Sequence, residues 1–196
     1  NLLYNIVDRI YIGHMAEVGA TALTGVGLFM PILMLINAFA MLAGAGGAPL
    51  AAIRMGRKEH DFAEKILGNC FTVLMIFAVA LTVIFYVTAP TLLQMFGASQ
   101  VTLPYALSYS RIYILGSVFV LVVMGMNPFI TTQGFAKISM MTTVIGAVIN
   151  IILDPIFIFV FHLGVKGAAL ATVLSQAVGA IWILRFLSGK KTSLHL

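Results

Sequence analysis

Asp154 lies inside a long uncharged stretch of the sequence, where a carboxylate is costly. No other charged side chain occurs in residues 138–161, and this stretch exceeds the roughly 20 apolar residues that a membrane-spanning helix needs. An Asp near the centre of such a helix costs about 2.5–3.5 kcal/mol on insertion. Ionisable residues within membrane spans usually have a function. We therefore interpret Asp154 as a candidate functional group.

Two neighbours of Asp154 suggest what the carboxylate could bind. Asn150 precedes it by one helical turn and shares its helix face. Pro155 has no N–H, so the carbonyl of Ile151 loses its helical partner. Oxygen groups suit a hard cation such as Na⁺, and a buried carboxyl can instead take up H⁺, so the two would compete for one site. The alternative interpretation is a turn that ends a shorter helix, but it would strand the apolar residues 156–161.

Asp8 is the only other acidic residue within a predicted span, and Thr172 offers a hydroxyl in the last span. Adjacent residues on a helix do not face each other, so Arg9 does not pair with Asp8. An interfacial position near a helix end explains Asp8 equally well. Thr172, in turn, would ordinarily bond its own backbone. From the residues alone, both stay weaker candidates than Asp154.

Aromatic residues and methionines could line a substrate cavity. Tyr105, Tyr109 and Tyr113 form an i, i+4, i+8 stripe. This stripe favours an interfacial belt or a packed face, although aromatic faces also suit organic cations. The eleven methionines could form an adaptable apolar cavity, but core packing is their more usual role. Tyr113, Met124 and Met126 are the predicted cavity residues.

The composition indicates that lipid surrounds this chain. It is 61% hydrophobic and only 9% charged, with mean hydropathy +1.09, whereas soluble domains have about 25% charged residues. A single cysteine excludes an internal disulfide, and no Cys/His spacing resembles a metal site. Basic residues cluster at loop ends, so the net charge of +5 reflects membrane orientation and not nucleic acid binding.

Six spans organise the sequence into one all-α membrane bundle. The charged segment 54–65 must lie outside lipid, and its i,i+4 pairs Arg57/Asp61 and Asp61/Lys65 favour a short surface helix. No signal-peptide pattern is present, and the apolar start predicts a truncated first helix. The polar residues 188–196 would suit a cytoplasmic linker. The predicted helices cover residues 1–15, 20–53, 67–93, 101–132, 138–161 and 167–187.

Basic residues predict the orientation of these spans. Only Lys166 lies in the turns on one side, while Arg9 and Arg111 lie within spans. By the positive-inside rule, both chain ends are predicted to be cytoplasmic. Eight of the eleven Lys and Arg residues lie on that side: Arg54, Arg57, Lys58, Lys65, Lys137, Arg185, Lys190 and Lys191.

Small residues recur at helical spacing on two spans. Ala40/Gly44/Ala48 and Ala43/Gly47/Ala51 form stripes on the second span, and Gly167/Ala171 forms one on the sixth. Such stripes let helices approach closely in lipid, so we expect them to be packing surfaces.

Several motifs together resemble a known family. Residues 7–13 (VDRIYIG) resemble the VDxxxIG pattern in the first helix of the multidrug and toxic compound extrusion (MATE) transporters. Residues 150–155 (NIILDP) resemble the NxxxDP pattern of their fifth helix, and residues 164–172 (GVKGAALAT) resemble the start of their sixth. Residues 134–137 (GFAK) also fit the turn before the fifth helix. The motifs occur in the family's order.

This resemblance implies an architecture and a role. MATE transporters have twelve helices in two six-helix lobes, and the chain resembles the N-terminal lobe, so a second lobe is the expected partner. Four residues would form a cation or proton site: Asp8, Asn150, Asp154 and Thr172. The implied activity is secondary active antiport. Cationic lipophilic drugs or toxic compounds would leave the cell across the plasma membrane in exchange for Na⁺ or H⁺, with no cofactor.

Three alternatives remain open at the level of sequence. A flippase for lipid-linked substrates would want a basic cavity for an anionic cargo, but Arg9 and Arg111 are the only bases within spans. An intramembrane aspartyl protease would need two carboxylates that share a proton, yet its Tyr-Asp and Gly-x-Gly-Asp patterns are absent, so no enzymatic activity is expected. A non-transporting assembly unit that pairs with another chain is the third.

Overall fold

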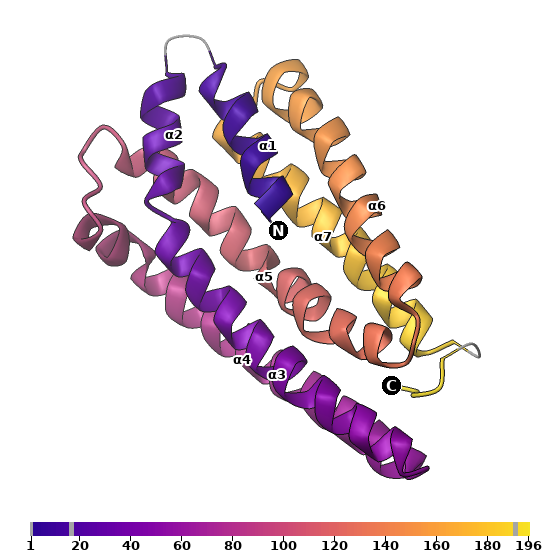
Figure 1. Ribbon diagram of the computed structural model, residues 1–196. Helices are drawn as coiled ribbons and strands as arrows, with labels where there is room; N and C mark the ends of the chain where they lie inside the picture. Colours follow the sequence, from indigo (N-terminus) through magenta and orange to yellow (C-terminus); the bar gives the residue numbers. More distant parts are fainter. Residues whose placement is uncertain (1, 16–17, 190–191) are drawn as a thin grey trace.

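The chain folds as a bundle of helices, shown in Figure 1. The computed structural model describes residues 2–15, 18–189 and 192–196. In chain order, the helices are α1 (Leu2–Gly13), α2 (Gly19–Gly27), α3 (Met30–Gly56), α4 (His60–Met95), α5 (Leu103–Thr132), α6 (Ala136–Pro155), the π-helix η1 (Ile156–Val160) and α7 (Val165–Leu187).

Five of these helices are long and apolar enough to cross a membrane, namely α3, α4, α5, α6 together with η1, and α7. On the outer face of α4, Val79 is 68% exposed and Val87 is 72% exposed. Apolar side chains exposed in this way along a helix fit contact with lipid. The described chain is therefore a multi-pass membrane protein.

The charged segment after α3 differs from the sequence prediction. Instead of a separate surface helix, residues 60–65 form the first turns of α4. A helix of 36 residues is about 54 Å long at 1.5 Å per residue, whereas the hydrocarbon core is about 30 Å thick. The charged turns can therefore extend beyond lipid without any break in the helix.

The predicted second helix is interrupted. Residues 20–53 were expected to form one helix, but Leu28 and Phe29 separate α2 from α3. Pro31 stands at the start of α3 and has no N–H for the carbonyl of Gly27, which breaks the hydrogen-bond ladder. The glycine-rich residues 44–47 do not interrupt α3 and are continuous helix.

A proline also changes the helix that carries Asp154. Pro155 is the last residue of α6, and η1 follows it directly. The backbone N–H of Phe161 donates to the carbonyl oxygen of Ile156 at 2.9 Å, a five-residue step. Short π-helical segments are rare and frequently mark functional sites.

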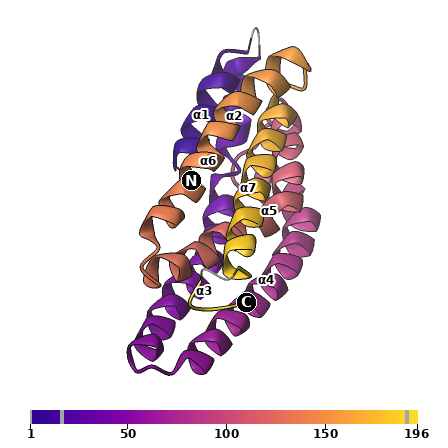
Figure 2. The same ribbon diagram turned by 90° about the vertical axis from the view of Figure 1, so that its right-hand side faces the viewer.

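Helix α5 is the centre of the bundle. It contacts α2, α3, α4, α6 and α7, and Figure 2 shows it between α7 and α4. The stripe of small residues on α3 packs against it: a Cβ added at Gly44 would lie 3.0 Å from the carbonyl oxygens of both Met124 and Gly125. The expectation that this stripe is a packing surface is therefore confirmed.

The polar tail folds back onto the bundle. Oε1 of Gln133, just after α5, accepts hydrogen bonds from the Thr192 hydroxyl at 2.7 Å and the Ser193 N–H at 2.8 Å. The His195 N–H donates to Glu64 in α4 at 3.0 Å. The end of α5, the start of α4 and the residues after α7 thus share one end of the bundle.

Candidate functional site

Asp8 lies at the centre of a buried polar cluster. Its Oδ2 accepts hydrogen bonds from the Tyr109 hydroxyl and from the Thr172 hydroxyl, each at 2.9 Å. Its Oδ1 accepts from the Asn150 amide at 3.3 Å. The carboxylate of α1 is therefore held by side chains from α5, α6 and α7.

Asn150 joins the two acidic residues. Besides Asp8, its amide nitrogen lies 3.2 Å from Oδ1 of Asp154 and 3.4 Å from the Thr172 hydroxyl. The carboxyl groups of Asp8 and Asp154 lie close together, because both accept a hydrogen bond from this one amide nitrogen. Two like charges in one buried site repel strongly, so the arrangement favours a proton or a cation shared between them.

The cluster is sealed from its surroundings and has no basic partner. Asp154 is 0% exposed and Asp8 is 1% exposed. Within the described residues, the ion pair found is Arg54 with Glu59, at the opposite end of the bundle. Buried charges are normally paired or bound to a cation. Among the described residues, no basic side chain forms an ion pair with Asp8 or Asp154.

Two oxygens in the cluster have unmet hydrogen-bonding capacity. Oδ1 of Asn150 and Oδ2 of Asp154 are buried and make no hydrogen bond with the described residues. Together with the Asp8 carboxylate and the Thr172 hydroxyl, they form a set of oxygen ligands of the kind that hard cations prefer. Among the described residues, no group of three or more His, Cys, Asp or Glu is placed so that it could hold a metal ion. The donor set therefore fits Na⁺ or H⁺ better than a transition metal.

Each element places its residue through local packing. Asn150 and Asp154 are one turn apart at the end of α6. Gly167 of α7 lies directly against η1, because a Cβ added there would be 2.7 Å from the Phe157 backbone. This close approach brings the start of α7, with Thr172, beside the end of α6. Tyr109 is fixed by ring contacts with Phe29 at 5.7 Å and Tyr113 at 6.0 Å between centroids.

The structure brings together all four residues that the sequence and the family resemblance singled out. Sequence reasoning noticed Tyr109 only as part of an aromatic stripe and missed its bond to Asp8. A buried tyrosine usually needs a polar partner for its hydroxyl. The central position of Tyr109 in the stripe could therefore have indicated that it bonds to an acidic residue. Tyr109 is 2% exposed.

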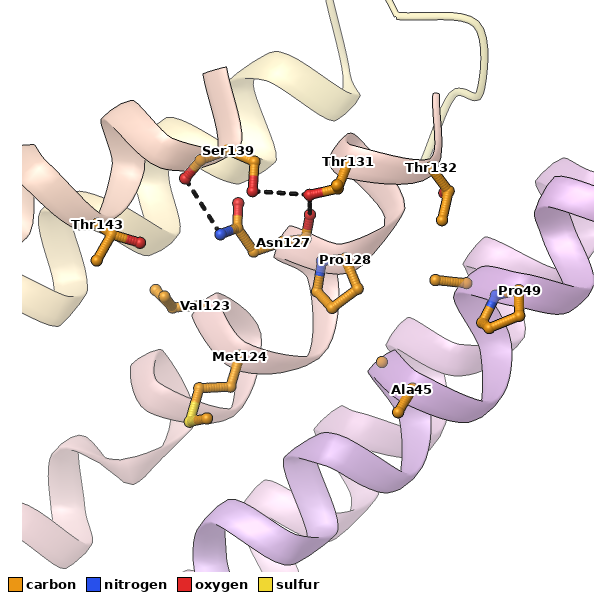
Figure 3. A pocket seen from close by; sticks show the side chains of 12 residues that line it. Ala45, Pro49, Val123, Met124, Asn127, Pro128, Thr131, Thr132, Ser139 and Thr143 are labelled. Atoms are coloured by element: carbon orange, nitrogen blue, oxygen red, sulfur yellow. Dashed lines mark hydrogen bonds between the residues drawn. The ribbon is translucent and has the colours of Figure 1, made fainter. Parts of the chain in front are cut away.

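The residues predicted for a substrate cavity differ in their surroundings. Tyr113 and Met126 are buried in the core, while Met124 lines a pocket between α3, α5 and α6 (Figure 3). This pocket lies toward the end of α5, away from the polar cluster. The assignment of these three residues to one cavity stays a prediction.

The fold and the buried cluster define the chain as a polytopic membrane protein with a polar site enclosed among its helices. Residues 1–156 match the family model MatE. Over 99% of its length the chain is 28% identical to the multidrug export protein MepA of Staphylococcus haemolyticus. It is also 30% identical to an inward-facing structure of a multidrug resistance MATE family transporter, with a TM-score of 0.92 over 98% of the chain. An outward-facing structure gives a TM-score of 0.90 at 30% identity, over 99% of the chain.

The chain belongs to the MATE family, which consists of transporters and not enzymes. It spans 42% of the MepA relative and 43% of each of the two solved chains. The described chain thus corresponds to about the N-terminal half of a MATE transporter, one lobe of the family's architecture.

Proposed function

We propose that this lobe carries the ion-coupling site of an antiporter that exports lipophilic organic cations in exchange for Na⁺ or H⁺. The observation that carries the proposal is the pair of buried, facing carboxyls without a basic partner in the described residues. The names of the relatives, a multidrug export protein and multidrug resistance transporters, support drugs as the cargo. A second six-helix lobe would complete the cavity.

Coupling would act through α1. Asp8 is the contribution of α1 to the cluster, and its three partners lie on α5, α6 and α7. A bound cation or proton would cancel the repulsion between Asp8 and Asp154 and hold α1 against those helices. Loss of the ion would release it. Such a site drives exchange only if it binds the ion with different affinity in the two access states.

The charge distribution also supports an orientation and a cargo. We place both chain ends in the cytoplasm of a plasma-membrane protein, because the basic residues concentrate at the end of the bundle that holds residues 54–59 and the turn before α6. An anionic lipid-linked cargo is disfavoured because acidic and not basic side chains form the buried cluster.

Asp154→Asn in the complete protein, expressed from its own gene, tests this function. The amide keeps the size of the side chain but can neither bear the negative charge nor release a proton. We expect cells that express the variant to accumulate ethidium like cells without the transporter. Asp61→Asn is the matched control, because Asp61 is exposed at the start of α4, and it should export normally. Unchanged export and ion dependence in Asp154→Asn, at equal protein level, would contradict the proposal.

A further inference from the structure

A groove of about 430 Å³ opens between the start of α6 and the end of α7. It is lined by Ile138 of α6 and by Trp182, Arg185 and Phe186 of α7. The rings of Phe135 and Phe186 meet edge to face, with their centroids 5.2 Å apart, and hold the two helix ends together. The groove lies at the basic end of the bundle, whereas the polar cluster lies at the opposite ends of α6 and α7 (Figure 1).

The groove continues into an apolar strip on the outer face of α7. Leu174, Val178 and Ile181 follow one another at intervals of four and three residues, so they share one face of the helix. Their side chains are 40% to 62% exposed. Arg185 comes four residues after Ile181 and ends this strip. An apolar strip that ends in a cation matches the layout of an anionic phospholipid, which has apolar acyl chains and a charged headgroup.

The positive charge at the groove is available to an anion. Arg185 is exposed, and so is Lys137, the residue directly before Ile138 of the groove wall. Among the described residues, neither side chain has an ion pair or a hydrogen-bond partner. A negatively charged group from outside the described chain would therefore meet basic side chains that this part of the chain does not neutralise.

Trp182 indicates that the groove lies at the membrane surface. Its side chain lines the groove and is 39% exposed. Tryptophan is enriched where headgroups meet hydrocarbon, because its ring is apolar and its N–H is polar. The orientation proposed above places this end of the bundle in the cytoplasmic leaflet, and basic pockets between helices on that side suit anionic headgroups.

We propose that the groove between α6 and α7 binds one anionic phospholipid from the cytoplasmic leaflet. The headgroup phosphate would contact Arg185, and the indole N–H of Trp182 would face the glycerol region. An acyl chain would lie along the apolar strip of α7. The lipid site goes beyond the proposed export function and does not require it, because it shares no residue with the ion-coupling cluster.

Quenching of Trp182 fluorescence by brominated lipids tests the proposal. The complete protein is made with Trp182 as its only tryptophan and is placed in phosphatidylcholine bilayers in which one fifth of the lipid is brominated. We expect brominated phosphatidylglycerol to be preferred over brominated phosphatidylcholine by about fivefold, the effect of one basic side chain near the surface. Equal quenching by the two lipids, or quenching by neither, would overturn the proposal.

Arg185→Gln removes the charge and keeps much of the side chain. We expect this variant to lose the preference for phosphatidylglycerol, while brominated phosphatidylcholine quenches Trp182 as it does in the wild-type protein. Arg57→Gln is the matched control, because Arg57 is exposed at the same end of the bundle but lies outside the groove, and it should keep the preference. A preference that persists in Arg185→Gln, or that falls equally in Arg57→Gln, would overturn the proposal.

Glycerol phosphate separates a lipid site from a site for a soluble anion. It carries the charge of the headgroup but has no acyl chains to lie on the apolar strip. We expect millimolar glycerol phosphate to change quenching by brominated phosphatidylglycerol less than twofold, because apolar contacts also hold the lipid. Displacement of the lipid would overturn the proposal in favour of a soluble anion. None of these measurements depends on export or on ion coupling.

Discussion

Asp8 depends on partners that are distant in sequence. Its contacts reach Tyr109, Asn150 and Thr172, more than a hundred residues away. Of these, the Tyr109 and Thr172 hydroxyls share one carboxylate oxygen, so each helps to fix its direction. A site of this kind is sensitive to the loss of a single hydroxyl even when the fold is unchanged.

Tyr109→Phe removes one donor and keeps the packed ring. We expect the affinity for Na⁺ to fall by about tenfold, because the Asp8 carboxylate loses a bond that fixes its direction. The affinity for H⁺ should instead rise, because the lost bond stabilises the charged carboxylate. Protein level and thermal stability should change little. Tyr105→Phe is the control from the same stripe, since its hydroxyl makes no hydrogen bond with the described residues. Ion-dependent thermal stabilisation of the purified complete protein measures the effect, and equal behaviour of the two variants would count against a role for Tyr109.

Sequence reasoning recovered the local part of this site but not its long-range part. Asn150 and Asp154 were predicted from their spacing, because both lie on one helix. Asp8 and Thr172 became strong candidates only through the family motifs, since no spacing rule links α1 to α7. The role of Tyr109 was missed because a buried tyrosine and an interfacial tyrosine look alike in an apolar helix.

Among the helices, α3 and α5 approach each other closely enough for their backbones to come into contact range. Gly44 faces the α5 backbone, whereas a Cβ added at Gly46, two residues later, would meet nothing within 4 Å. Alanine at position 44 therefore tests helix packing, whereas alanine at position 46 tests helix propensity alone. Gly44 also lines the pocket between α3, α5 and α6, so its packing affects the shape of that pocket.

Gly44→Ala should destabilise the lobe by about 1–2 kcal/mol, because the added methyl forces α3 away from α5. Gly46→Ala should leave stability unchanged or raise it, because alanine favours a helix more than glycine does. Thermal unfolding of the complete protein in detergent compares the two variants. A lower melting temperature for Gly46→Ala than for Gly44→Ala would refute the packing account.

Helix boundaries were predicted well where composition changes sharply and poorly where a proline acts within an apolar run. The span 101–132 agrees closely with α5, since polar turns flank it. The break at residues 28–29 and the π-helix after Pro155 were missed. A proline in an apolar sequence predicts a disturbance of the helix, but whether the backbone breaks or widens depends on the surrounding packing.

At the scale of the whole molecule, the lobe is a single bundle whose helices pack around α5. Its fold is similar to both inward-facing and outward-facing transporters. Under the proposed function, this likeness favours a mechanism in which the lobe moves largely as a body and α1 responds to the ion. The proposed orientation of the lobe places both chain ends in the cytoplasm.

Single cysteines at the two ends of the bundle test that orientation. In a background without other cysteines, we expect His162→Cys, in the turn before α7, to react with a membrane-impermeant maleimide in intact cells. Lys137→Cys, in the turn before α6, should react only after the cells are opened. The reverse pattern would place the basic end outside and would remove the positive-inside argument.

Gradient-driven exchange by the complete protein in liposomes tests the central claim, that Asp8 and Asp154 couple ion and cargo. We predict that an imposed Na⁺ or proton gradient drives ethidium uptake by the wild-type protein. In Asp8→Asn and in Asp154→Asn, ethidium should still bind, but neither gradient should drive its movement. Gradient-driven uptake at the wild-type rate in both variants would contradict the account.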